Sequence, residues 1–347
     1  MSHPNPRDSI KSTWRRQDRS QWTIWHKILD SLDAHHVDLD KEVPVHQKDE
    51  KIPYMSEWYL HRWIVFYTGM ALALHELYAR YTGSNFGPVL AYIFYYYASR
   101  YSTIHEIRIL RGLGHKYGFL DGDQHERDGV PDSGVQKTLT SVFLASTVRP
   151  LFMIYLSYTA NRTPSAINFL LLPFQAGVYG IVLDFWFYWY HRLMHEVDGL
   201  WKYHRRHHLT KHPNPLLTIY ADHEQEFFDI AGIPLMAFFS MKLLGFPMGF
   251  YEWYFCQEYV LFAEVAGHSG LRIHAAVPNP LTFLLRVFDA ELVIEDHDLH
   301  HRRGWKSSYN YGKQTRLWDR VFGTSGKRIE SAQDNVDYGA RVSMPLF

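Results

Sequence analysis

The chain lacks several features that would assign it to common protein classes. It has one cysteine, Cys256, so an intrachain disulfide is excluded and a thiolate-rich metal site is not expected. Lys plus Arg and Asp plus Glu each number 36, so the formal net charge is zero and gives no reason to expect nucleic-acid binding. The N-terminal segment MSHPNPRDSIKSTWRRQDRS is polar, and we therefore expect no cleavable signal peptide.

Motifs of common hydrolases are also missing. The His-Glu pairs at 75–76, 105–106, 195–196 and 223–224 are not followed by the second histidine of H-E-x-x-H, and no G-x-S-x-G occurs. These absences argue against a zinc protease of that type and against a serine hydrolase built on a nucleophile elbow.

Aromatic residues make up 16% of the chain, and several long segments are apolar. A membrane-spanning helix needs roughly 20 mostly apolar residues. We expect about four spans, although a soluble protein with buried helices stays open as an alternative. The strongest candidates are 167–190, 227–248 and 138–160; the weaker ones are 63–81 and 87–99; segment 250–267, with three glutamates, is a candidate re-entrant helix.

Strand patterns are scarce, so the predicted fold class is all-α: a polytopic membrane helical bundle with a helical, His-rich cytosolic cap. We divide the chain into a polar cytosolic leader, a helical hairpin with a polar loop, a segment that contains the histidine clusters, and a tail. The corresponding ranges are 1–58, 59–136, 137–330 and 331–347.

Eight of the 22 histidines lie in three short clusters. These are HRLMH at 191–195, HRRHH at 204–208 and HDLHH at 297–301. Residues three and four apart share a helix face, so each cluster can direct two or three imidazoles to one point. Eight convergent imidazoles exceed the ligands of one ion and indicate two metal ions. Imidazole suits iron, zinc, copper and nickel.

The polar sections that carry the clusters flank one apolar stretch of about 40 residues, long enough to cross a membrane and return. Lys and Arg crowd beside the clusters, which favours the cytoplasmic side. The three clusters are therefore expected to meet on the cytosolic face.

The clusters and their surroundings resemble the fatty acid hydroxylase/sterol desaturase superfamily, a group of membrane-bound, histidine-ligated diiron enzymes. The resemblance covers about 167–324 and includes DFWFYWYHRLMH, LWKYHRRHH, YADHEQE, AGHSGLRIH, HDLHH, NYG and LWDRVFGT. It implies that 137–330 is a catalytic domain of the endoplasmic-reticulum membrane. It also implies two iron ions, O2 as co-substrate, and electrons from an external reductase, often through cytochrome b5.

The resemblance also implies a set of metal ligands and supporting side chains. The expected iron ligands are His191, His195, His204, His207, His208, His268, His297, His300 and His301, with His223 and His274 as further candidates. The carboxylates expected to hold the ligands by hydrogen bonds are Asp184 and Glu226, with Asp298 and Glu295 as weaker candidates. Asp184 lies seven residues before His191, on the same helix face, and a metal-bound histidine commonly donates its second ring N–H to a carboxylate.

The expected function is O2-dependent hydroxylation or desaturation of an unactivated C–H bond in a lipid, with a sterol-like substrate favoured. Two alternatives stay open: a relative with altered chemistry, such as an aldehyde-processing or secondary-metabolite oxygenase, and a non-catalytic His-rich metal-binding or transport protein of the membrane. The histidines scattered through polar segments of the sequence are expected to be solvated: His26, His35, His36, His46, His115 and His125.

Overall fold

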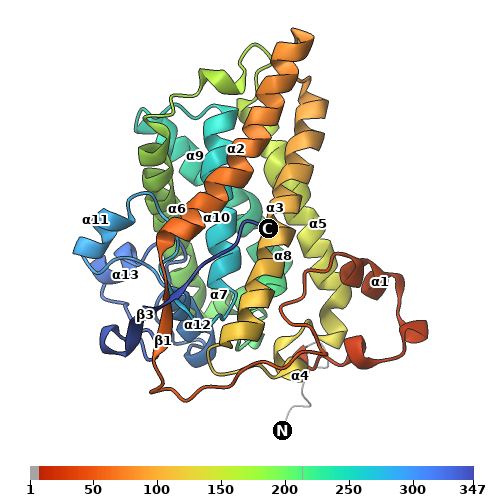
Figure 1. The fold of residues 1–347 in the computed structure, drawn as a ribbon, viewed down its shortest axis with the longest axis vertical. Coiled ribbons are helices and arrows are strands. Elements are labelled where there is room, and N and C mark those ends of the chain that lie inside the picture. Colours follow the sequence, from red (N-terminus) through yellow and green to blue (C-terminus); the bar gives the residue numbers. More distant parts are fainter. Residues whose placement is uncertain (1–7, 213) are drawn as a thin grey trace.

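A computed structural model describes residues 8–212 and 214–347 as a bundle of long helices with short elements gathered at one end (Figure 1). The predicted apolar segments lie mostly in helices; the exceptions include 167–171 and 244–248, which are turn or loop. The long helices are α2 (Glu57–Thr82), α3 (Pro88–Tyr117), α5 (Val135–Ser157), α6 (Leu172–Glu196), α9 (Ile233–Leu243) and α10 (Phe250–Gly267). The prediction of a mostly helical protein is therefore confirmed.

Local sequence sets the ends of these helices. The Ser56 side chain accepts a hydrogen bond from the amide of Trp58 and so caps the start of α2. Gly83 ends α2 with a φ of 67°, a left-handed conformation that glycine adopts without strain. Pro88 is the first residue of α3, where its missing N–H is not needed.

Helix α10 is the centre of the bundle. It packs against α2, α3, α5 and α6, and all of its residues except Leu261 are buried. The three glutamates that suggested a re-entrant segment are thus enclosed by other helices: Glu252, Glu258 and Glu264.

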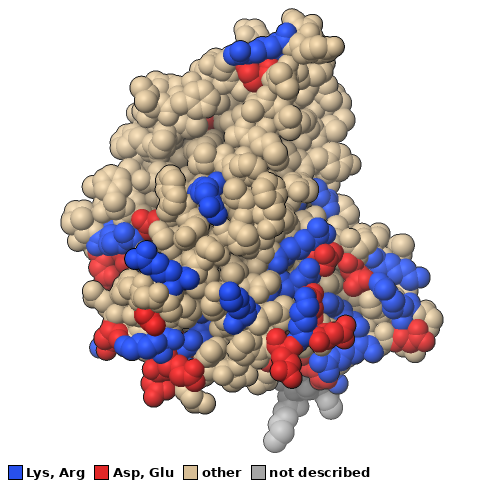
Figure 2. Space-filling view, viewed as in Figure 1, with Lys and Arg blue, Asp and Glu red and all other residues tan. Residues whose placement is uncertain are grey.

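Membrane character is supported by the distribution of charge and apolar side chains. One helical stretch of the described residues, His125–Ser157, is long and apolar enough to cross a membrane by length and composition, so the number of spans stays a prediction. Lys, Arg, Asp and Glu gather on the lower half of the face in Figure 2, and few lie on the upper half. Large apolar side chains are exposed on the outer helices, among them Leu77, Ile93, Leu151, Tyr155, Phe239 and Leu243. Such a surface is typical of a contact with lipid or with another protein.

A small parallel sheet corrects the all-α prediction. Strands β1 (Ile52–Met55), β2 (His274–Ala275) and β3 (Val336–Val342) lie in the order β2-β1-β3. Strands β1 and β2 are too short to produce a recognisable alternation, whereas β3, VDYGARV, does carry an apolar residue at every second position and was missed in the sequence. The sheet joins the polar leader and the tail to the segment that follows α10.

The short elements lie at the lower end of the bundle in Figure 1 and carry most of the histidine clusters. They are α7 (Asp198–His204), the 3-10 turns η6 (His207–Leu209) and η7 (Pro215–Leu217), α8 (His223–Phe227), the π-helical turn η8 (Phe228–Gly232), α12 (Ile294–Arg303) and α13 (Leu317–Val321). Helices α1 (Ile24–Ser31), α4 (His125–Asp128) and α11 (Thr282–Val287) complete the described chain together with short 3-10 turns.

Candidate metal centre

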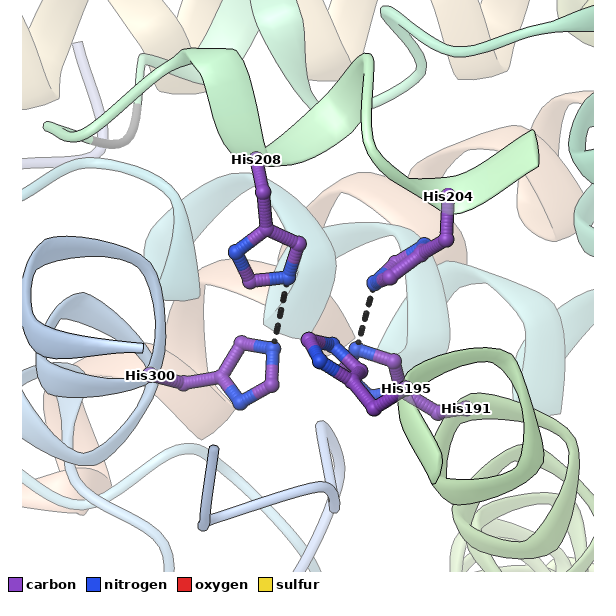
Figure 3. A group of neighbouring side chains, drawn as sticks. All are labelled: His191, His195, His204, His208 and His300. Carbon is purple, nitrogen blue, oxygen red and sulfur yellow. Dashed lines mark hydrogen bonds between the residues drawn. The ribbon is translucent and has the colours of Figure 1, made fainter. Parts of the chain in front are cut away.

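Nine buried histidines converge in two adjacent groups, and within each group the ligand nitrogens lie within 4.8 Å of one another. The first group comes from α6, α7, η6 and α12 (Figure 3). It contains His191, His195, His204, His208 and His300; the second contains His207, His268, His297 and His301. The rings of His208 and His301, one from each group, stack at 4.7 Å.

Five of the nine rings are oriented by backbone carbonyls. A carbonyl only accepts hydrogen bonds, so each of these Nδ1 atoms carries the proton and each Nε2 is left with a lone pair. The pairs are His191 to Tyr311 (2.7 Å), His195 to Trp305 (2.8 Å), His268 to Glu264 (2.7 Å), His300 to Tyr309 (2.6 Å) and His301 to Thr210 (3.1 Å).

His204 is held by a side chain instead. Its Nδ1 lies 2.9 Å from Oε1 of Gln225, while the amide nitrogen of Gln225 donates to Asp229 at 3.1 Å. The second contact fixes which end of the amide faces the ring, so His204 Nδ1 must donate. His204 is therefore a sixth ring with its lone pair on Nε2.

Three pairs of Nε2 atoms approach one another closely. His191 and His204 approach at 3.0 Å, as do His208 and His300, and His268 and His297 (Figure 3 for the first two pairs). In the first pair both Nδ1 atoms are donors, so two lone pairs point at each other. A cation between such nitrogens removes this repulsion.

Two further ring nitrogens point to the same conclusion. The Nε2 atoms of His195 and His301 are buried and have no hydrogen-bond partner among the described residues. Unpartnered buried acceptors are rare in folded proteins, and a metal ion between the rings would supply the missing partner. The donor sets contain only imidazole nitrogen, which suits iron, copper, zinc or nickel and not magnesium or calcium.

Burial keeps these histidines neutral and therefore able to bind metal. Loss of solvent lowers the pKa of His268 to about 4. The pKa values of His300 and His301 are well below the ordinary value for the same reason, and neighbouring imidazoles lower them further. Only the neutral imidazole offers a lone pair to a metal ion.

Asp184 supports the site in a different way from the one predicted. Its carboxylate does not contact His191, because it accepts the backbone amides of 313–315 at 2.8 to 3.2 Å and the hydroxyl of Thr315 at 2.7 Å. The loop that Asp184 holds follows Tyr311, whose carbonyl orients His191. Asp184 thus acts through the backbone rather than on the ring.

The other predicted carboxylates also make contacts away from the rings. Glu226 binds Lys137 at 2.8 Å and contacts Ser141, and Asp298 lies 2.7 Å from Arg302. Glu295 accepts backbone amides of 329–331. These carboxylates were predicted to orient the metal-binding rings by hydrogen bonds. That prediction is wrong, because these contacts go to other side chains and to backbone amides.

Two candidate ligands lie outside both groups. The His223 side chain is 78% exposed and contacts Glu226. His274 belongs to β2, where it pairs with Tyr54 of β1. Nine of the eleven candidate ligands therefore converge in the structure.

Residues that sequence reasoning missed orient the rings. Gln225 directly precedes the predicted Glu226, so the motif YADHEQE indicated the right segment but the wrong side chain. Backbone carbonyls such as that of Trp305 have no sequence signature at all. The scattered His35, His36 and His125 are buried, contrary to the prediction that they are solvated.

Known proteins with similar sequences include hydroxylases and monooxygenases. Residues 176–324 match the fatty acid hydroxylase family. The chain is 41% identical over 319 residues to a fatty acid hydroxylase, vlmA, of Lecanicillium sp, covering 87% of each protein. It is 32% identical over 157 residues to methylsterol monooxygenase 1-3 of Arabidopsis thaliana, covering 45% of this chain and 49% of the relative. It is 26% identical over 173 residues to the alkylglycerol monooxygenase of Homo sapiens, covering 48% of this chain and 33% of the relative. No solved structure matches the chain.

Proposed function

Because this chain belongs to the fatty acid hydroxylase family, we propose that it is a membrane-bound, O2-dependent oxidoreductase that hydroxylates or desaturates an unactivated C–H bond of a lipid. The observation that carries the proposal is the pair of adjacent, buried, all-histidine groups with their Nε2 atoms turned inward. The named relatives are hydroxylases and monooxygenases, which supports an oxidoreductase.

The proposed cofactor is a pair of iron ions, one held by each group of histidines. Bound iron with O2 supplies the oxidising power that removal of hydrogen from an unactivated carbon needs. The chain's own part is to hold nine imidazoles neutral and oriented, and to exclude bulk water through their burial.

The proposed substrate is a lipid with a long hydrocarbon portion. The relative matched over 87% of the chain is named a fatty acid hydroxylase, which favours an acyl-chain lipid. The partial match to a methylsterol monooxygenase supports the sterol-like preference drawn from the motifs. Exposed apolar side chains on α3 and α5 suit a molecule that works in a bilayer.

The proposed location is the endoplasmic-reticulum membrane, with the histidine groups on the cytosolic side. Cytochrome b5, or a similar carrier with its reductase, is the proposed electron donor. Both proposals rest on the family's sequence motifs and on the charged lower half of the molecule.

The test is metal content and lipid-dependent oxygen uptake of the purified protein, with and without His300→Ala. We expect about two iron ions per chain in the wild type, and loss of metal and of oxygen uptake in the variant. His223→Ala is the matched control, because this exposed histidine lies outside both groups. Full metal content and activity in His300→Ala would overturn the proposal. Metal binding without oxygen uptake for any lipid would favour a metal-binding or transport protein.

A further inference from the structure

A largely apolar cavity lies between α3, α5 and α10 and reaches η7 at the metal end of the bundle. Its walls include side chains that are partly exposed on the outer surfaces of α3 and α5, so the cavity has access from that side. The apolar lining is contributed by Ile104, Ile107, Val142, Met153, Phe250 and Leu261, among others.

Glu258 is one of four charged residues in this lining, with Arg100, Arg149 and Glu264. It is buried, at 6% exposure, and its two carboxylate oxygens accept from the hydroxyls of Ser99 at 2.5 Å and Ser102 at 3.2 Å. Each oxygen of a carboxylate has two lone pairs, so both oxygens can accept another hydrogen bond.

The other two glutamates of α10 show what Glu258 lacks. Glu252 is paired with Arg162, and Glu264 is paired with Arg149 and Lys313. Among the described residues Glu258 has no basic partner, although all three carboxyl groups are buried on one helix. A buried ionisable group without a partner is costly and usually serves a function.

Neighbouring groups give this part of the cavity the same polarity. Gln257 also lines the cavity, and its Oε1 has no hydrogen-bond partner among the described residues. Glu106 follows Ser102 by one turn on α3 and is buried with an unpartnered oxygen, although it does not line the cavity itself. Around Glu258 the cavity thus presents oxygen acceptors that a ligand with a donor group would satisfy.

We propose that Glu258 recognises the polar end of the substrate, and that this end carries a hydrogen-bond donor, a hydroxyl or an amine, rather than a free carboxylate. The apolar walls then receive the hydrocarbon portion. The statement that this ligand is oxidised rests on the proposed function. The statement that it binds at Glu258 does not.

Helix α10 sets the distance between Glu258 and the histidine groups. Glu258 precedes His268 by ten residues, which is about 15 Å along a helix. The oxidised carbon is therefore expected far from the polar end and not next to it.

The test compares a long-chain alcohol, the amine and the carboxylic acid of the same chain length on full-length protein in lipid nanodiscs. Binding is followed by the ligand-induced rise in Tm, which needs neither oxygen nor turnover. We expect the alcohol and the amine to bind about tenfold more tightly than the acid. Equal binding of all three would overturn the assignment.

Two variants separate charge from hydrogen bonding. Glu258→Gln keeps the shape and a carbonyl acceptor, so the amine should lose about tenfold in affinity, the alcohol less, and the acid should bind better. Ser146→Ala, in the α5 wall of the cavity, should keep the wild-type ranking, because its hydroxyl binds only its own helix. An unchanged amine-to-acid ratio in Glu258→Gln would contradict the proposal. Should this variant not fold, the wild-type ranking alone decides.

Product analysis distinguishes this proposal from the proposed function. Tight binding of the alcohol without oxygen uptake would count against the oxygenase and leave Glu258 as the recognition residue. Oxidation at the carbon next to the polar group would count against Glu258 alone.

Discussion

Asp184 and Asp319 together hold five consecutive backbone amides of one loop. Asp319 accepts the amides of Tyr311 and Gly312, each at 2.8 Å, and Asp184 accepts the next three. Asp184 belongs to α6 and Asp319 to α13, so the two carboxylates also connect these helices through the loop. Their joint effect is to fix the carbonyl of Tyr311 against His191.

Replacement of Asp184 tests this arrangement. Asp184→Asn keeps the shape but offers one acceptor oxygen in place of two, so at least one buried amide loses its partner at a cost of about 1–3 kcal/mol. We expect a lower Tm and a metal affinity reduced by about 10- to 100-fold. Asp337→Asn is the matched control, since Asp337 caps two amides in exposed backbone. An unchanged metal affinity in Asp184→Asn would show that the loop does not orient His191.

Gln225 and Glu226 are neighbours with different predicted effects. Gln225→Ala removes the acceptor for His204 Nδ1, so the ring is free to rotate and metal affinity should fall about 10- to 100-fold. Glu226→Gln should retain metal, because Glu226 contacts no ring of either group. Equilibrium metal titration of both variants measures the difference. Equal affinities would mean that the Gln225 contact is incidental.

Metal removal should destabilise the protein. In the metal-free chain the Nε2 lone pairs of His191 and His204 remain 3.0 Å apart without a cation between them. Chelation should therefore lower Tm, and added ferrous iron should restore it. His300→Ala should show a smaller response to the chelator than the wild type. A wild-type Tm that is insensitive to chelation would argue against a metal within the groups.

His274 predicts a pH dependence that is separate from the metal site. Burial, with the nearby charge of Arg328, lowers its pKa to about 4, below the ordinary value of 6.5. The neutral form therefore favours folding fully above pH 6.5, and that stability is lost as pH falls from 6.5 through 4. The loss is at most about 3 kcal/mol.

A neutral replacement checks this assignment. His274→Gln should flatten the decline of Tm with falling pH in that window, and His223→Gln should not, because His223 is mostly exposed. Parallel Tm curves for wild type and His274→Gln would refute it.

The spacing within the three clusters predicted that eight histidines converge, and the family resemblance added His268, but neither predicted how the nine divide into two groups. HRRHH was read as one helical face, whereas His204 and His208 join the first group and His207 the second. The reason is the break between α7 and η6, where a tighter turn separates neighbouring rings. In HDLHH, likewise, His300 belongs to one group and His297 and His301 to the other. Spacing alone cannot show such divisions, because they depend on which other elements pack against each face.

Tertiary contacts decided the remaining differences. Three charges within 250–267 suggested partial insertion, but the basic partners Arg162 and Arg149 come from distant segments that no local window includes. The partners of Asp184 lie about 130 residues further along the chain, so helix-face reasoning chose the nearer His191 instead.

The small sheet has a consequence for the order in which the protein is made. Ile52 of β1 pairs with Val336 of β3, and Tyr54 with His274 of β2, so the middle strand is synthesised long before either neighbour. During translation both edges of β1 are at first unpaired. Strand β2 can pair with one edge, but the other edge stays unpaired until β3 has been synthesised. A fragment that stops before β3 would keep α2 through α12 and still expose a strand edge on which a second nascent chain could pair.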